Sequence, residues 1–249
     1  MKKSQQSIII TGASGGIGSS LCQMFKDKGY FVIATDKIKI KAPYDLFIEM
    51  DLMDYVYDLS LRKNFIKKIN QVVKSKKLIG LINNAAIQLL DNTINIDIDD
   101  FNKSIDINVK APLLLVQDLF SFLEDSKGTV INIGSIHSDL TKKDFLSYAV
   151  SKSALKGLTR SLSIDLARHG ISTNMIQPAA IRTQMLESGF SKNKDGLRQL
   201  SSFHPLGKIG EPKEIAKIAL FLIENKDSFI NGGTIQLDGG ISGCLHDPN

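Results

Sequence analysis

The chain has 249 residues, 43% of them hydrophobic and 23% charged, which is typical of a globular protein and excludes a disordered or fibrous one. No apolar run approaches the ~20 residues that span a bilayer, and no signal-type segment opens the sequence, so we expect a cytoplasmic protein without a membrane partner. The net charge of +5 comes from dispersed lysines without interleaved aromatic residues, which argues against a nucleic-acid partner.

Apolar segments alternate with helical patterns along the chain, which predicts an α/β fold with a doubly wound parallel sheet. The predicted strands are residues 7–10, 30–35, 46–49, 78–82, 129–133, 173–176 and 234–237. The predicted helices are residues 17–28, 61–74, 99–122, 145–168 and 213–223. Cys22 falls in the first helix and should be buried. Neither it nor Cys244 has a metal or redox spacing, so we expect no metal.

No repeat, low-complexity stretch or linker divides the sequence, so we expect one domain over residues 1–249. The least regular segment, 185–204, is rich in glycine, serine, lysine and asparagine and precedes Pro205. Its position predicts a substrate lid, although a plain surface insertion would have the same composition.

A glycine-rich turn, Thr11-Gly-Ala-Ser-Gly-Gly-Ile-Gly18, joins the first predicted strand to the first predicted helix. This order is typical of a dinucleotide-binding βαβ unit. Gly12 permits the tight turn, while Gly16 and Gly18 let the backbone approach a pyrophosphate at the helix amino terminus. The spacing Gly-x-x-x-Gly-x-Gly differs from the common Gly-x-Gly-x-x-Gly, and a glycine turn without any ligand is the alternative.

Tyr148 and Lys152 lie four residues apart in a predicted helix, so their side chains share one face. An adjacent ammonium favours the phenolate, and lowering a phenol pKa by about three units needs roughly 4 kcal/mol. The pair indicates a general acid or base. A solvated helix face would show the same spacing.

Together with four further segments, these two motifs resemble the short-chain dehydrogenase/reductase family over nearly the whole chain. The further segments are Asn83-Asn-Ala-Ala86, Pro178-Ala-Ala-Ile-Arg-Thr183, Gly210-Glu-Pro-Lys-Glu-Ile-Ala216 and Gly232-Gly-Thr-Ile-Gln-Leu-Asp-Gly-Gly240. The resemblance implies a single Rossmann-like domain, a seven-stranded parallel sheet with helices on both faces. It also implies hydride transfer between a nicotinamide cofactor and a secondary alcohol or ketone. Ala86 and Ala179 replace glycines usual in the family, and each adds a methyl near the cofactor.

The resemblance implies four catalytic residues, Asn108, Ser135, Tyr148 and Lys152. Tyr148 would be the general acid or base, and Lys152 would lower its pKa and bind the nicotinamide ribose. Ser135 would hydrogen-bond the substrate oxygen, and Asn108 would hold a water through which the proton leaves. Without the resemblance, Ser135 is interpreted as a turn cap and Asn108 as a mid-helix polar residue. His137 is not expected to be catalytic.

The resemblance also implies a cofactor site. Its residues are Gly12, Ser14, Gly15, Gly16, Ile17, Gly18, Asp36, Asp51, Leu52, Asn83, Ala85, Tyr148, Lys152, Pro178, Ile181 and Thr183. Asp36 would bind the adenosine ribose and repel the 2′-phosphate of NADP, so NAD is expected. NADP remains possible because Lys37 and Lys39 follow. Asp51 and Leu52 would hold the adenine, although an acid there is often a helix cap.

Three functions stay open. The first is an NAD-dependent dehydrogenase of secondary alcohols or polyols. The second is an NADPH-dependent 3-oxoacyl carrier-protein reductase, which Asp36 and the Ile87-Gln-Leu89 segment disfavour. The third is a non-catalytic nucleotide-sensing protein, which would have no need for Ser135, Tyr148 and Lys152 together.

The family commonly forms tetramers through the helices predicted here at 99–122 and 145–168, so the resemblance implies a homotetramer or homodimer. The partner in the reaction would be a small molecule that the sequence does not specify. Three basic residues near the predicted lid, Arg182, Lys192 and Lys194, favour an anionic substrate.

Overall fold

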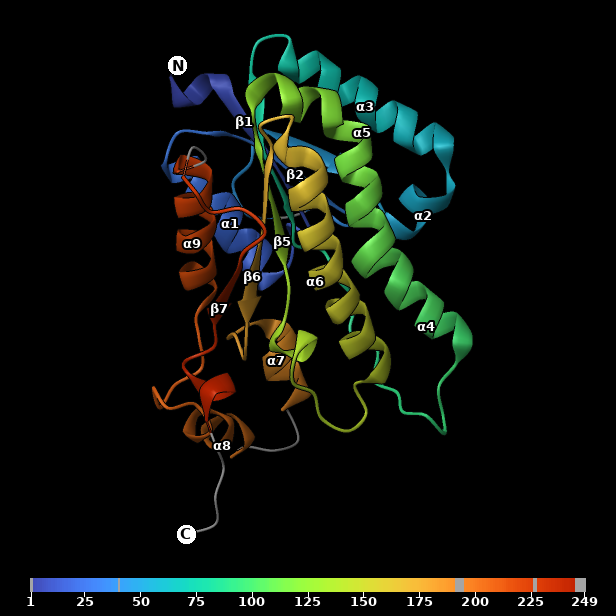
Figure 1. Ribbon diagram of the computed structural model, residues 1–249, viewed down its shortest axis with the longest axis vertical. Helices are drawn as coiled ribbons and strands as arrows, with labels where there is room; N and C mark the ends of the chain where they lie inside the picture. The colour runs from blue at the N-terminus through green and yellow to red at the C-terminus, as the bar shows by residue number, and fades with distance from the viewer. Residues whose placement is uncertain (1, 40, 191–194, 226–227, 245–249) are drawn as a thin grey trace.

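The computed structural model describes residues 2–39, 41–190, 195–225 and 228–244. Within them, seven parallel strands form one sheet in the order β3-β2-β1-β4-β5-β6-β7 (Figure 1). The strands are β1 (Gln6–Thr11), β2 (Phe31–Asp36), β3 (Leu46–Glu49), β4 (Lys77–Asn83), β5 (Thr129–Ile133), β6 (Ser172–Pro178) and β7 (Thr234–Leu237). The predicted fold class is confirmed, and every strand lies within two residues of its predicted bounds.

The strand order reverses between β1 and β4, because the chain first adds β2 and β3 on one side and then β4 to β7 on the other. In an open parallel sheet, ligands bind at the carboxyl ends of the strands at such a switch point. The ends of β1 and β4, at Thr11 and Asn83, therefore mark where a ligand site is expected.

Five long helices cover the two faces of the sheet. They are α1 (Gly16–Asp27), α3 (Leu59–Val73), α5 (Ala111–Ser126), α6 (Leu146–Ala167) and α9 (Pro212–Glu224). Alternation along β1 divides the core: Ile8 and Ile10 pack with α1 and α9, while Ile9 packs with α3, α5 and α6. Figure 1 shows α1 and α9 on one side of the strands and α5 and α6 on the other. Cys22 of α1 is buried, as expected.

The segment predicted as one helix over 99–122 is helical throughout but has three parts. α4 (Ile98–Ile105) leads into a π turn (Asp106–Lys110), which leads into α5. Pro112 lacks the N–H that an α-helix would direct at the carbonyl of Asn108, which accounts for a change of hydrogen-bonding pattern at this point. Single π turns are frequent at functional sites, and this one carries Asn108.

A short helix that the sequence did not indicate, α2 (Leu52–Tyr57), follows β3. Asp51 caps it, because its carboxylate accepts a hydrogen bond of 2.8 Å from the backbone N–H of Met53. Leu52 and Tyr55 are buried, so packing outweighs a sequence rich in tyrosine and valine.

The predicted lid, 185–204, contains two helices in its described parts, α7 (Gln184–Gly189) and α8 (Gly196–Ser202), and residues 191–194 lie outside the described chain. Figure 1 shows both helices at one end of the sheet. Two backbone hydrogen bonds close the base of the segment, from Arg182 to Gly210 at 2.8 Å and from Gly210 to Ala180 at 2.9 Å. We propose that residues 1–249 form one domain in which this segment is the lid.

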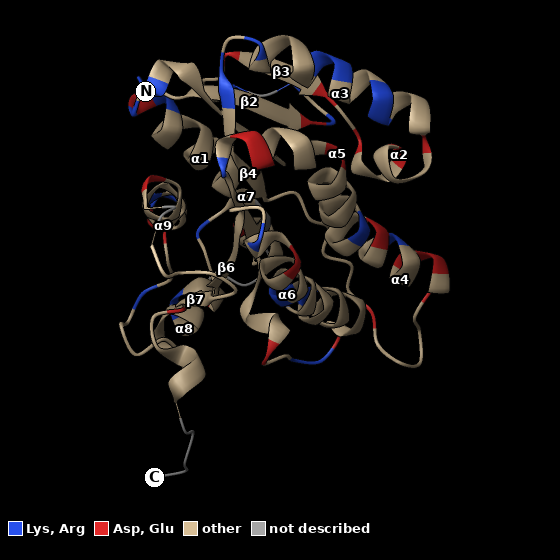
Figure 2. Cartoon of the chain, turned by 45° about the horizontal axis from the view of Figure 1, so that its top comes forward, with Lys and Arg blue, Asp and Glu red and all other residues tan. Residues whose placement is uncertain are grey.

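Charged residues are spread over many elements (Figure 2). Basic residues are frequent on α3 and acidic residues at the start of α4. Among the described residues, no helix combines the length and the apolar character needed to cross a membrane.

Candidate active site

The glycine turn after β1 is packed too closely for side chains at two positions. Gly12 has φ +62°, and a Cβ there would lie 2.6 Å from the Cα of Ala85. A Cβ on Gly18 would lie 2.1 Å from the Gly12 carbonyl oxygen. Gly15 precedes α1 without a capping side chain, so the first N–H groups of α1 are left for another acceptor. This cradle fits the phosphates of a dinucleotide.

Two residues that the sequence did not single out join this turn to the loop after β4. The Thr11 hydroxyl accepts hydrogen bonds of 3.0 Å from the backbone N–H groups of Asn84 and Ala85. The Asn84 amide donates to the carbonyls of Thr11 and Gly12, at 2.9 and 3.0 Å. Their only signal in the sequence is a polar residue at each of two strand ends, which is common in turns. The two loops therefore form one unit at the switch point.

Asn83, a predicted cofactor residue, directs its side chain into the fold. Its amide donates to Asn132 at 2.8 Å, and the Asn132 amide donates to Thr159 of α6 at 2.9 Å. The Asn83 Oδ1 is buried without a hydrogen-bond partner in the described structure. A contact between Asn83 and a cofactor would therefore come from its backbone.

The predicted nucleotide residues Ser14 and Asp36 lie together. Asp36 Oδ2 accepts hydrogen bonds from the Ser14 N–H at 2.9 Å and the Ser14 hydroxyl at 2.6 Å. Its Oδ1 accepts from the Lys37 N–H at 2.8 Å. Asp51 instead caps α2, and Leu52 is buried, so the alternative role as a helix cap is the one this structure shows for the Asp51 carboxylate.

The segment after β6 also reaches the glycine turn. A Cβ on Gly16 would lie 3.0 Å from the Thr183 methyl, so these residues are in contact. Thr183 also caps α7, since its hydroxyl accepts from the Leu186 N–H at 3.3 Å. Pro178 ends β6, and Ile181 is buried where it pairs with Gly210. Ile17, half-buried, packs against the core beneath the turn.

Tyr148 and Lys152 lie on one face of α6, as predicted. The Lys152 ammonium is 5.7 Å from the centroid of the Tyr148 ring and donates to the Ile133 carbonyl at 2.9 Å. Burial lowers the pKa of Lys152 to about 8. Burial also raises the pKa of Tyr148, and a hydrogen bond to Ser135 opposes this rise. The predicted lowering of the Tyr148 pKa by Lys152 is therefore not found in this arrangement, because desolvation dominates.

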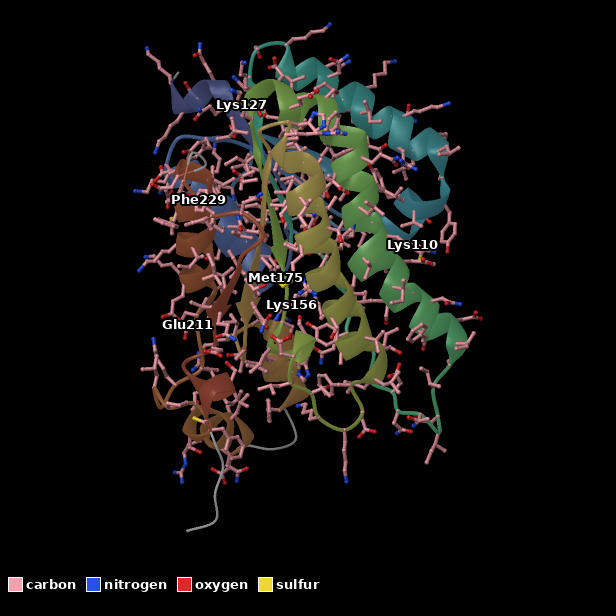
Figure 3. All side chains as sticks on the ribbon, viewed as in Figure 1. Lys110, Lys127, Lys156, Met175, Glu211 and Phe229 are labelled. Atoms are coloured by element: carbon pink, nitrogen blue, oxygen red, sulfur yellow. The ribbon has the colours of Figure 1, made fainter. Side chains whose placement is uncertain are left out.

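Ser135 follows β5 through Gly134, which packs against Met175 (Figure 3). Its hydroxyl accepts from the His137 N–H at 3.2 Å and so caps the short 3₁₀ turn Ile136–Ser138. The same side chain is near enough to the Tyr148 phenol to oppose the rise of its pKa. Ser135 thus combines the capping role with the predicted position beside Tyr148.

Lys156 and Asp139 pair at 2.6 Å and fasten the end of that turn to α6 (Figure 3). Asp139 also accepts from the Gln177 amide of β6 at 2.9 Å. The turn that carries Ser135 is therefore held from two neighbouring elements.

Asn108 is buried in the π turn and its amide is almost fully used. Its Oδ1 accepts from the Ile87 N–H, and its Nδ2 donates to the Ile87 carbonyl and to the Ser151 hydroxyl, each at 2.9 Å. An amide oxygen has two acceptor positions, so one remains for the predicted water. The amide chiefly fixes the loop after β4 to α6.

Three aromatic rings meet at Tyr148. His137 stacks on Phe145 with centroids 4.5 Å apart, and the Tyr148 ring lies 5.7 Å from His137 and 6.2 Å from Phe145. Burial and the nearby Lys142 ammonium lower the pKa of His137 to about 4, so its imidazole is neutral near pH 7. Phe145 was not anticipated, because an isolated phenylalanine before a helix carries no signal of its own.

Of the three basic residues expected near the substrate, the structure describes only Arg182. Arg182 pairs with Glu211 at 3.0 Å and lies 3.8 Å from Glu187, so its charge is already balanced. Lys192 and Lys194 lie outside the described residues. No group of three or more His, Cys, Asp and Glu side chains in the described chain is placed to hold a metal ion.

Known proteins resemble this chain over nearly its whole length. A family model described as "Enoyl-(Acyl carrier protein) reductase" matches residues 12–242. A 3-oxoacyl-[acyl-carrier-protein] reductase of Rickettsia felis is 31% identical over 236 residues, which cover 94% of this chain and 95% of the relative.

Three solved structures share the fold. The ligand-free aldohexose dehydrogenase of Thermoplasma acidophilum has a TM-score of 0.89 at 25% identity, covering 98% of both chains. ElxO with NADP bound and 4-hydroxyisoleucine dehydrogenase with NADH each have a TM-score of 0.85, at 26% and 28% identity. Each alignment covers 96% of this chain and 100% of the other. The chain therefore belongs to the short-chain dehydrogenase/reductase family of NAD(P)-dependent oxidoreductases.

Proposed function

We propose that this oxidoreductase is an NAD-dependent dehydrogenase of a secondary alcohol, acting in the cytoplasm as a homo-oligomer on a small molecule. The observation that carries the choice of NAD is the Asp36 carboxylate at the end of β2. Three hydrogen bonds, two from Ser14 and one from the Lys37 N–H, hold this carboxylate in place. No Lys or Arg side chain of the described chain pairs with it, so its charge would oppose a 2′-phosphate.

We propose that the cofactor phosphates are held by the cradle of Gly12, Gly16 and Gly18 and by the amino terminus of α1. The same edge of the sheet carries Ser135, Tyr148 and Lys152, so the cofactor and the reacting groups share one site. When bound, the nicotinamide ring accepts or supplies the hydride.

Tyr148 is the proposed acid or base. Its raised pKa favours the protonated phenol, which gives its proton to the ketone oxygen during reduction. In oxidation, the alcohol proton passes to the oxygen of the Tyr148 phenolate, a form that the bound substrate and cofactor would have to favour, with the Lys152 ammonium 5.7 Å from the ring centroid. Ser135, which lies beside the phenol, is proposed to orient the substrate oxygen. Asn108 is proposed to support proton release through the open acceptor position on its Oδ1.

Fluorescence titration with NADH and NADPH tests the cofactor proposal. We expect wild type to bind NADH more tightly than NADPH. In Asp36→Asn, the difference between the two affinities should be smaller. Glu49→Gln is the matched control. Glu49 is the residue opposite Asp36 in the backbone register of β2 and β3, so this substitution removes the same charge one strand away. An equal preference in wild type and Asp36→Asn would contradict the role of Asp36.

A screen then tests the reaction, with secondary alcohols, polyols and sugars offered with NAD, and an acetoacetyl thioester offered with NADH and NADPH. The 3-oxoacyl carrier-protein reductase is the second candidate because the Rickettsia felis relative, with that name, covers nearly the whole chain. Tight NADPH binding with thioester reduction would establish that alternative. Turnover that survives Tyr148→Phe would refute the proposed mechanism.

A further inference from the structure

The amino terminus of α6 is held by a carboxylate from a distant loop. Asp91, in the loop after β4, is only 6% exposed. Its Oδ1 accepts a hydrogen bond of 2.9 Å from the Ser147 N–H, and its Oδ2 accepts from the Ser147 hydroxyl. The backbones pair as well, since Asp91 N–H donates to Asp144 at 3.1 Å and Leu146 N–H donates to Asp91 at 3.3 Å.

This arrangement replaces a cap that α6 lacks. Its N-cap residue is Phe145, which has no acceptor for the free N–H groups of the first turn. The helices α2, α3 and α4 are instead capped locally, by Asp51, Asp58 and Asp97. Asp91 reaches α6 from 56 residues away, and its negative charge lies at the positive end of the helix dipole.

The loop that carries Asp91 is fixed at three points. Asn84 and Ala85 bond to Thr11 of the glycine turn, and Asn108 bonds both backbone groups of Ile87. Asp91 is the third point. The loop therefore connects the predicted cofactor cradle to the first turn of α6.

Tyr148 directly follows Ser147, so the contact between Ser147 and Asp91 fixes the backbone position from which the Tyr148 side chain extends. The turn before it is itself unusual: Asp144 has φ +63° and its carboxylate accepts from the Asn92 amide at 2.8 Å. Without Asp91, Ser147 would lose the partner of its buried N–H and of its buried hydroxyl. A shift of this turn would move the phenol away from Ser135.

We propose that Asp91 is a positioning residue for Tyr148, acting through the N–H and hydroxyl of Ser147. The inference rests on the proposed role of Tyr148 as the acid or base. It adds that the loop after β4 sets the geometry of Tyr148 as well as lining the cofactor site.

The test compares Asp91→Ala, Asp91→Asn and the control Asp58→Ala. An asparagine can accept from the Ser147 N–H and donate to its hydroxyl, so it keeps the geometry without the charge. Asp58→Ala removes the cap of α3, which carries none of the candidate site residues. The whole chain is labelled with ¹³C at the tyrosine ring carbon that bears the hydroxyl, and Tyr148→Phe assigns the signal. NADH affinity, thermal midpoint and kcat on the best substrate of the screen are measured alongside.

We expect Asp91→Ala to shift or split the Tyr148 signal and to lower kcat at least ~10-fold, equivalent to about 1.4 kcal/mol in the barrier, with NADH affinity within about threefold of wild type. Asp91→Asn should restore one Tyr148 signal and most of kcat. Asp58→Ala should lower the thermal midpoint alone. An unchanged Tyr148 signal in Asp91→Ala would overturn the proposal even if the protein turns over no substrate, because the signal is read without turnover.

Discussion

Replacing Asn108 by alanine is expected to destabilise the fold as well as to reduce turnover. The change removes three hydrogen bonds of 2.9 Å that the buried amide makes to Ile87 and Ser151. At about 1 kcal/mol each, the loss is roughly 3 kcal/mol of unfolding free energy. The unpaired N–H and carbonyl of Ile87 add to this cost if water does not reach them.

Thermal unfolding measures this loss directly. For a chain of this size, 1 kcal/mol lowers the midpoint by about 2–4 °C, so Asn108→Ala should unfold roughly 6–12 °C below wild type. Asn102→Ala is the matched control, because Asn102 is exposed on α4, half a dozen residues before Asn108. We expect its midpoint within about 1–2 °C of wild type, since surface changes usually alter stability by less than about 0.5 kcal/mol.

The stability and the turnover of Asn108→Ala separate two roles. If its midpoint matches that of Asn102→Ala while kcat falls, the amide serves only a proton pathway and the structural reasoning is wrong. If both fall and NADH affinity weakens, the side chain acts by fixing the loop after β4.

Three further outcomes follow from the site and its surroundings. Lys152→Met should abolish turnover yet raise the thermal midpoint at pH 7. Burial lowers the Lys152 pKa from 10.5 to about 8, so keeping the buried ammonium charged costs roughly 3 kcal/mol, at about 1.36 kcal/mol per pKa unit. An unchanged or lower midpoint would contradict this reasoning. The pKa of His137 is about 4 in the folded state against 6.5 in the unfolded state, so the unfolded state binds more protons between these values. The free energy of unfolding should therefore fall as the pH drops from about 6.5 to 4. Urea unfolding should show a smaller fall of this free energy in His137→Asn than in wild type. Light scattering should find an oligomer that Ile164→Glu disrupts, because Ile164 is 76% exposed on α6, one of the helices expected to form the assembly. A monomeric wild type would refute that assembly.

The sheet and the glycine turn could be predicted because their signals are local. An apolar run such as Ile8 to Ile10 needs only burial on both faces to form a strand, and a glycine at position 12 or 18 is demanded by the backbone around it. The π turn could not be predicted, since it depends on how Pro112 and the buried Asn108 meet the loop after β4. α2 was missed for a similar reason: its sequence has weak helix propensity, and only its cap and its buried side chains stabilise it.

The direction of the Tyr148 pKa was predicted wrongly for a reason that spacing cannot reveal. Four residues on a helix place the ammonium near the ring, but they do not say which acceptor the ammonium meets. Here it meets the Ile133 carbonyl, and the surroundings bury Lys152 and half-bury Tyr148. Burial disfavours the ammonium and the phenolate alike, so it raises one pKa and lowers the other. A bound substrate and cofactor would have to supply the balance that favours the phenolate.

Acidic residues at element ends show the same limit most clearly. A carboxylate after a strand or before a helix accepts N–H groups whether it binds a ribose, caps its own helix or caps another one. Asp36 bonds Ser14, Asp51 caps the helix that follows it, and Asp91 caps α6 from a remote loop. Nothing in the composition around these three residues distinguishes them. Their roles follow from which backbone N–H groups the fold brings opposite each carboxylate. For Asp91 this group is the N–H of Ser147, the residue before Tyr148.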